Sequence, residues 1–318
     1  MAWVYISIIL LMRVVQNIFT KSNVKLVPKN SVGYLKYTIF YIACAAIPAF
    51  LLFVIEYLRQ SQALFFWETL LYASISGVSL AISCCCSLYA LSTGTMVLNS
   101  LFATAGLLVP SIAGIFLWQE YLSFFQYVAI VVFIVGAYLL IGSSKDLYGK
   151  FSLKTLCVLV VNLITNGLTM LMQTIFARNV SGGSVSMFSL LSFLSGALIL
   201  SLVLVVVFAI LKKSTERETV SKDFQMWPTK GDTVSLPKKV YLGVIFLAIA
   251  VFVINQLATM SANMVSPVVL FAFINGGATI ISSLVGAIMY KEKFTIKSVV
   301  GLILGVSALI LIKVFSLA

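Results

Sequence analysis

Hydrophobic and polar residues are segregated along this chain into long blocks. Ten apolar blocks are each close to the roughly 20 residues that a helix needs to cross a bilayer, and short polar stretches separate them. The predicted membrane spans are 2–20, 35–57, 68–91, 95–118, 123–142, 152–177, 185–211, 240–261, 266–289 and 295–315. Because they use up nearly the whole chain, they leave no room for a soluble catalytic domain.

The polar stretches divide the spans into two groups of five. A connector at 143–150 separates a first unit, 1–143, from a second, 151–318. The only long polar segment, 212–239, mixes both signs of charge with proline and glycine, and we predict a mobile solvated loop there. The first span is not a cleavable signal peptide, because it carries Arg13, Gln16 and Asn17 inside and has no small-residue cleavage site.

Two patterns occur in both halves at equivalent places. Gln16–Lys21 and Gln173–Arg178 share Gln-x-Ile-Phe-x-basic near the end of the first span of each half. Each half also closes with a glutamate at a turn, followed by an apolar span. Small residues lie nine and sixteen positions after those glutamates, Ala129 and Gly136 after Glu120, and Gly301 and Ala308 after Glu292. The pattern indicates duplication, and five spans per half would invert the second copy in the membrane.

Composition agrees with a membrane protein and excludes other classes. Hydrophobic residues make up 61% of the 318 residues and charged residues only 9%, unlike any soluble domain. The net charge of +12 does not indicate nucleic acid, because the lysines flank apolar spans, where they set topology and meet anionic headgroups. Three of the five cysteines are adjacent, at 84–86, and histidine is absent, so we predict no metal, no cofactor and no disulfide framework.

The five-plus-five plan resembles the drug/metabolite transporter superfamily, specifically its paired EamA-type domains. The residue match is the end of each half: small residues, the glutamate turn, a hydroxyl three residues on (Ser123, Thr295) and the small residues above. The resemblance covers the whole chain in plan and the last third of each half in residues. It implies an all-α integral membrane transporter with a central cavity formed by the first four helices of each half. The fifth helices would lie outside, facing lipid or a second copy, in a monomer or a homodimer.

Arg13 is the sharpest candidate for a binding residue. It lies about ten residues into the first span, where an arginine costs roughly 2.5–3.5 kcal/mol on translocon-type scales. Arg13, Gln16 and Asn17 share one helix face by their spacing of three and four residues. Arg13 either faces a cavity or snorkels to the surface from a shifted span. The apolar residues on both sides of it favour the cavity.

Polar stripes also mark other spans. Asn166 and Gln173 lie on one face of span six, together with Asn162 and Thr169, and span three offers Ser83 and Ser87. These amides either form the wall of a cavity or bond neighbouring helices. Tyr89 either caps a substrate by stacking or hydrogen bonding or lies at the membrane interface. Pro110 in span four and Gly276–Gly277 in span nine are either hinges or close contacts. The predicted substrate-binding residues are Arg13, Gln16, Asn17, Tyr89, Asn166, Gln173, Asn255, Thr259, Asn263 and Asn275.

No aspartate or glutamate lies deep in any span, and this shapes the predicted function. A buried carboxylate is the usual device for exchanging a proton against a cationic drug, and the small multidrug-resistance relatives have one in the first helix, where this chain has Arg13. We therefore predict a secondary transporter of small polar or anionic metabolites, amino-acid-like or nucleotide-sugar-like. The alternative is efflux of drugs or organic cations, with Glu68 reaching inward from its helix end.

Two other classes are disfavoured. An intramembrane enzyme would need a catalytic constellation, but the chain has no histidine and no aspartate in a span. A membrane scaffold or receptor explains poorly why both halves carry polar stripes.

We predict a multi-pass protein of the cell membrane. The loops after odd-numbered spans carry most of the lysines, so the positive-inside rule places them in the cytoplasm and both termini outside. The family resemblance implies cytoplasmic termini, and we follow the charge.

Overall fold

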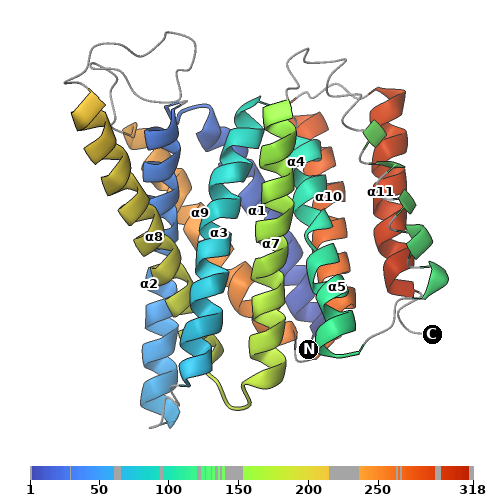
Figure 1. Cartoon of the computed structure of the whole chain (residues 1–318), viewed down its shortest axis with the longest axis horizontal. Coiled ribbons are helices and arrows are strands. Elements are labelled where there is room, and N and C mark those ends of the chain that lie inside the picture. The colour runs from blue at the N-terminus through green and yellow to red at the C-terminus, as the bar shows by residue number, and fades with distance from the viewer. Residues whose placement is uncertain are drawn as a thin grey trace.

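A computed structural model describes most of the chain as helix, and no strand occurs in the residues that it describes. These are 2–28, 30–60, 66–93, 96–119, 123–125, 127–129, 131–132, 135–136, 138–139, 153–214, 236–262, 264–265, 267–290 and 295–314. The helices, drawn in Figure 1, are α1 (Ala2–Val24), α2 (Ser31–Gln60), α3 (Trp67–Thr93), α4 (Met96–Ala105), α5 (Leu108–Leu117), α7 (Leu153–Asn179), α8 (Val185–Ser214), α9 (Lys238–Ser261), α10 (Pro267–Tyr290) and α11 (Ile296–Val314).

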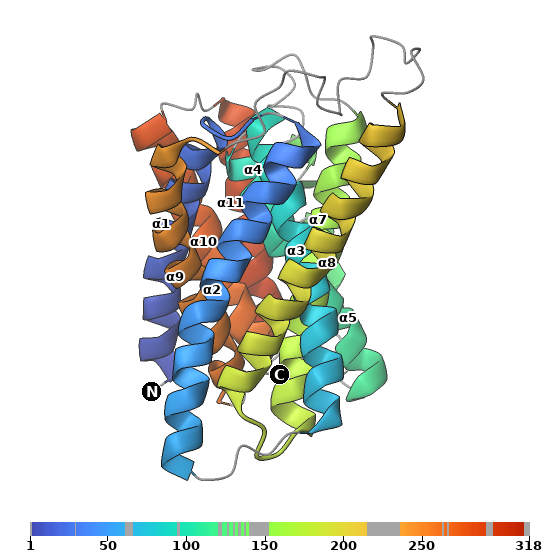
Figure 2. The ribbon, with the colours of Figure 1, turned by 90° about the vertical axis from the view of Figure 1, so that its left-hand side faces the viewer.

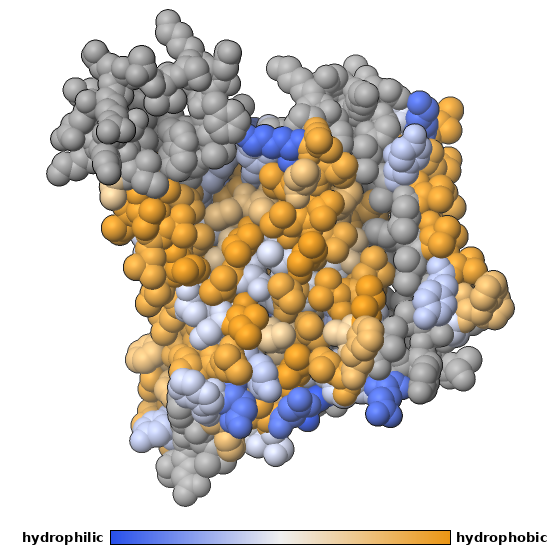
Figure 3. Space-filling model, in the orientation of Figure 1, coloured by the Kyte–Doolittle hydropathy of each residue, from blue (hydrophilic) through white to orange (hydrophobic). Residues whose placement is uncertain are grey.

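Six of these helices contain stretches long and apolar enough to cross a membrane. The stretches are Trp3–Val24, Val32–Arg59, Trp67–Ser92, Leu153–Asn179, Val185–Ala209 and Lys238–Ser261. Their outer faces are apolar too, with side chains such as Leu58, Leu198 and Leu242 exposed. Figure 3 shows hydrophobic residues over the middle of the molecule and hydrophilic ones near its two ends. This apolar surface is compatible with a membrane protein whose outer face contacts lipid rather than water.

Nine of the predicted spans coincide with described helices to within a few residues, and span four divides into two of them, α4 and α5. Span five, 123–142, lies only in part within the described residues. Pro110 explains the break, because proline has no N–H for the carbonyl four residues earlier and its ring crowds that carbonyl. The carbonyl of Gly106 instead accepts the N–H of Val109 at 3.0 Å, and Leu107 N–H donates to Thr104 at 3.1 Å. Gly276–Gly277 has no such effect, since α10 continues through both residues.

The long helices pack in pairs from distant parts of the chain. α3 packs against α7, α2 against α8, α1 against α9 and α4 against α10. Figure 2 shows α2 and α8 side by side on one face of the bundle. Two large apolar clusters fill the interior, beside a third, small one that includes Phe176 and Phe188. One of the large clusters includes Ile9, Leu101 and Ile254, and the other includes Leu88 and Phe193.

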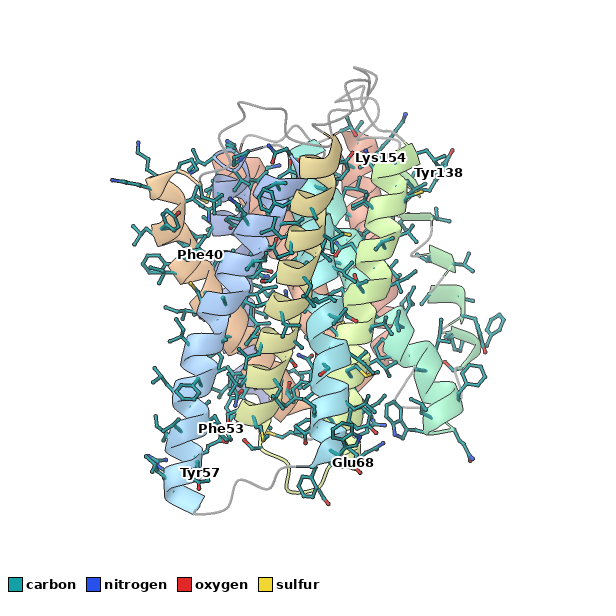
Figure 4. All side chains as sticks on the ribbon, turned by 60° about the vertical axis from the view of Figure 1, so that its left-hand side comes forward. Phe40, Phe53, Tyr57, Glu68, Tyr138 and Lys154 are labelled. Carbon is teal, nitrogen blue, oxygen red and sulfur yellow. The ribbon has the colours of Figure 1, made fainter. Side chains whose placement is uncertain are left out.

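The residues around the fifth span of each half meet through their small side chains. Ala129 and Ala308 are both fully buried. A Cβ on Gly136 would lie 2.8 Å from the Gly301 carbonyl oxygen, so the backbones of this segment and α11 touch. In Figure 1, α11 lies at the edge of the molecule, and in Figure 4 Tyr138 points outward. The small residues of the repeated pattern thus bring these two segments together, and their outer faces remain apolar.

We expect Gly77→Ala to destabilise the fold. A Cβ there would overlap the Ser192 carbonyl of α8. Backbone cannot move aside cheaply, and such overpacking costs about 1–3 kcal/mol, more than the roughly 1 kcal/mol gained by removing a helical glycine. Thermal unfolding of purified protein in detergent should show a lower melting temperature.

Gly277→Ala is the matched control, because a Cβ there would meet the flexible end of Leu10 at 2.7 Å. That leucine can shift, so the control should melt near wild type. Equal melting temperatures for the two variants would contradict the proposed contact between α3 and α8.

Candidate functional site: a polar cavity between the helices

A cavity of about 130 Å³ lies inside the bundle. Residues from α1, α2, α3, α4, α7, α9 and α10 line it, so it draws on both halves of the chain. It borders both large apolar clusters, with Ile254 and Phe271 from one and Leu88 and Leu247 from the other in its wall. Its polar lining therefore lies against the apolar interior of the bundle.

Seven of the ten residues predicted to bind substrate meet at this cavity. They are Arg13, Gln16, Asn17, Asn166, Gln173, Asn255 and Asn275. Asn263 lies outside the described residues. Two others are not in the cavity wall. Thr259 is fully buried and its hydroxyl donates to the Asn255 carbonyl at 2.9 Å. Tyr89 lies near the end of α3 with the Lys154 ammonium 5.7 Å from its ring centroid, which suits a position at the membrane interface.

Arg13 is the only charged residue among those lining the cavity. It lies one helical turn from Gln16, and its Nη1 donates to Gln16 Oε1 at 2.8 Å. Its Nε is buried and has no hydrogen-bond partner. The side chain keeps some accessible surface inside the cavity. Arg13 therefore faces the cavity with its hydrogen-bonding capacity only partly used.

The amide residues of the wall tie helices together. Gln173 Nε2 donates to Asn255 Oδ1 at 2.6 Å, joining α7 to α9. Asn166 Nδ2 donates to the Ala103 carbonyl at 2.6 Å, where α4 ends before the break. Asn275 Nδ2 lies 3.5 Å from Met170 Sδ, joining α10 to α7. Both interpretations of the polar stripes hold for these residues, since each bonds a neighbouring helix and also lines the cavity.

Sequence reasoning missed part of the wall. Tyr37 and Tyr41 line the cavity from α2, and Tyr37 accepts a hydrogen bond from the buried Asn23 at 3.0 Å. Thr104 of α4 lies 2.6 Å from the Thr279 hydroxyl of α10. The spacing of the two tyrosines by four residues was a usable signal. Further lining residues that were not in the predicted set are Thr20, Ser83, Cys84, Ser87, Asn99 and Ser100.

The described carboxylates lie away from the cavity. Glu68 is exposed in the first turn of α3, near one end of the bundle in Figure 4. Glu56 lies four residues before the end of α2 and accepts hydrogen bonds from the hydroxyls of Ser184 at 2.8 Å and Ser186 at 2.5 Å, at the start of α8. Neither lines the cavity. Within the described residues, Glu68 therefore gives a cationic substrate no counter-charge there.

Comparison with known proteins identifies a fold but no family. No family model matches this chain, and no curated protein matches it. Among solved structures, 28 chains match. One is a crystal structure that is similar over 99% of this chain and 98% of its own, with a TM-score of 0.65 and 13% sequence identity. The TM-score and the coverage show that the fold is shared along the whole chain, and an identity this low carries no function across.

Proposed function

We propose that this protein is a secondary transporter of small polar or anionic metabolites in the cell membrane. The cavity would serve as the substrate site and open alternately to each side. The observation that carries the proposal is Arg13, whose Nε has no hydrogen-bond partner, in a polar cavity walled by both halves. A charge inside a membrane protein is expensive and usually marks a substrate or ion pathway.

The helix contacts support two related halves. If the second half repeats the first, then α7, α8 and α9 correspond to α1, α2 and α3. A pseudo-two-fold axis then requires the contact of α1 with α9 to be matched by one of α7 with α3, and that of α2 with α9 by one of α8 with α3. All four contacts occur. This match supports a ten-span protein of two inverted five-helix repeats, 1–143 and 151–318, as in the paired EamA-type transporters that the sequence resembles.

The charge and size of the cavity favour small metabolites over drugs or organic cations. Its one charge is positive, and a cationic solute would meet Arg13 without a carboxylate to balance it. Its volume of about 130 Å³ is also below the roughly 300–1,000 Å³ typical of sites for drug-sized ligands. Efflux of cations remains the alternative, and it would need a carboxylate beyond those described.

Transport itself can be tested with purified protein in sealed liposomes. Liposomes loaded with a mixture of propionate, glycerate, serine, choline and UDP-glucose should lose at least one carboxylate faster than protein-free liposomes do. Loss of choline alone would favour the cation alternative. If no solute leaves faster, the protein would instead belong with membrane scaffolds or receptors.

The orientation of the chain follows from its basic residues. In Figure 1, α1, α3, α8 and α10 end, and α2, α7, α9 and α11 begin, at the same end of the bundle. The described lysines Lys25, Lys154 and Lys239 lie at or near these helix ends, whereas Arg59 lies near the last residue of α2, at the opposite end. The positive-inside rule therefore places the lysine-rich end in the cytoplasm and both termini outside.

Cysteine labelling of intact cells tests this orientation. A cysteine at Ser221, in the segment between α8 and α9 that the structure does not describe, should label with an impermeant reagent only after permeabilisation. A cysteine at the exposed Arg59 should label from outside, and the unsubstituted chain gives the background from native cysteines. The reverse pattern would show cytoplasmic termini, as the family resemblance implies.

A further inference from the structure

The polar groups of the cavity wall divide into a cationic donor and neutral acceptors. Asn255 Nδ2 donates to the Val251 carbonyl at 3.3 Å, so its Oδ1 must be the atom that faces Gln173. Gln173 therefore turns its NH₂ group toward Asn255, and Asn166 turns its NH₂ group toward the Ala103 carbonyl. Backbone carbonyls, which only accept, fix the orientation of all three amides.

The oxygens of two of these amides are left for a ligand. Gln173 Oε1 and Asn166 Oδ1 have no protein partner, yet neither is among the buried unsatisfied atoms. They therefore keep accessible surface, and both residues line the cavity. Asn275 adds a third such oxygen, because its NH₂ group faces Met170. These parts of the wall offer hydrogen-bond acceptors without negative charge.

Arg13 offers the opposite chemistry. Its Nη1 is held by Gln16, while Nη2 has no protein partner and is not among the buried unsatisfied atoms. An oxyanion can reach that group and pair with the guanidinium. Among the described residues no second cation lines the cavity, so a second negative charge on the ligand would be buried without a partner, which is costly.

Resting on the proposed transport function, we infer that the substrate is a small molecule with a single carboxylate and with hydrogen-bond donors away from that group. A hydroxycarboxylate or an aminocarboxylate has this chemistry. Its carboxylate pairs with Arg13, and its hydroxyl or ammonium group donates to the amide oxygens of Asn166, Gln173 and Asn275. The 130 Å³ cavity and the single positive charge disfavour nucleotide sugars, which carry two phosphates and a much larger body.

Thermal shift of the purified full-length protein tests this class with five probes. Propionate has the carboxylate alone, glycerate adds hydroxyls, and L-serine adds an ammonium and a hydroxyl. Choline is a cation, and UDP-glucose carries two negative charges. A ligand that binds the folded state raises the melting temperature. Glycerate or serine should do so at about tenfold lower concentration than propionate, the worth of one good hydrogen bond, and choline and UDP-glucose should have no effect.

Three outcomes would overturn the inference. One is propionate acting as well as both glycerate and serine. Another is UDP-glucose acting at the lowest concentration, and the third is no shift with either donor-bearing acid. The liposome experiment separates this failure from that of the proposed function. Export of UDP-glucose but of neither acid would leave transport standing and remove the substrate class proposed here.

Asn275→Asp gives a second, isosteric test. It replaces the amide NH₂ group by an oxygen, so that the neutral acceptor becomes a carboxylate, and it removes only the weak contact with Met170. Glycerate should then need at least tenfold higher concentration for the same shift, while serine should lose less because its ammonium group pairs with the new charge. Asn179→Asp, at the exposed end of α7, makes the same charge change outside the cavity and should alter neither probe. Equal losses for glycerate and serine would contradict the assignment of Asn275 to the donor-bearing end.

Discussion

Arg13→Gln is expected to slow transport of an anionic solute at least thirtyfold in liposomes. The change removes the only charge lining the cavity, and loss of one partner of a buried, hydrogen-bonded charge pair costs about 2–5 kcal/mol, or roughly thirtyfold and more. The melting temperature without ligand should not fall, because the variant also removes a buried Nε that has no partner.

Two further arginine variants make this test specific. Arg13→Lys keeps the charge but loses the planar guanidinium held by Gln16, so it should transport at an intermediate rate. Arg178→Gln removes an arginine at the end of α7, where the guanidinium stacks 4.5 Å from the ring centroid of Trp118, and should transport as wild type. Wild-type transport by Arg13→Gln in the same liposomes would contradict a substrate site at Arg13.

Ser87→Trp is expected to abolish transport by filling the cavity. Ser87 lines the cavity wall from α3, and an indole is large enough to occupy much of the 130 Å³ that the substrate would use. Transport of every solute that the wild type carries should stop, whatever its charge.

The matched control for this variant lies on the same helix. Ile82 of α3 is 38% exposed on the outer surface, where an added indole would face lipid. Ile82→Trp should therefore transport at the wild-type rate, and both variants should be purified as folded protein. Full activity of Ser87→Trp would show that solutes do not pass through this cavity.

The helices were predictable because the membrane imposes a minimum apolar length on every span. This requirement places the ends of α3, α7 and α9 within two residues of the predicted spans. The split of span four was less visible. Pro110 indicated a distortion but not its place. The break lies at Gly106 because the carbonyl of that residue, four positions before Pro110, loses its helical donor. Gly276–Gly277 showed the same ambiguity and resolved the other way, as a close contact with Leu10.

Some of the residues that line the cavity could be predicted from their own span alone. Arg13, Asn166 and Gln173 could be predicted, because a charge or an amide in the middle of a span must find a partner or a polar space. Thr259, also predicted to bind substrate, is not among the residues that line the cavity. Its short hydroxyl is satisfied by a carbonyl of its own helix, so its place on a polar stripe carried no need for a cavity.

Other lining residues depend on how helices distant in sequence meet. Tyr37 resembles an ordinary aromatic of a membrane span until α1 brings Asn23 to its hydroxyl. Thr104 and Thr279 are separated by 175 residues and bond each other across α4 and α10. No pattern within either span predicts that pairing, because it is set by the packing of the two halves.

The most direct measurement is the efflux of glycerate and serine from liposomes containing either wild-type protein or Arg13→Gln. Both proteins would be reconstituted at equal density, with protein-free liposomes setting the leak. We expect wild type to release at least one of the two acids well above the leak and Arg13→Gln to fall close to it. Equal rates of release by the two proteins, or release by neither above the leak, would contradict it.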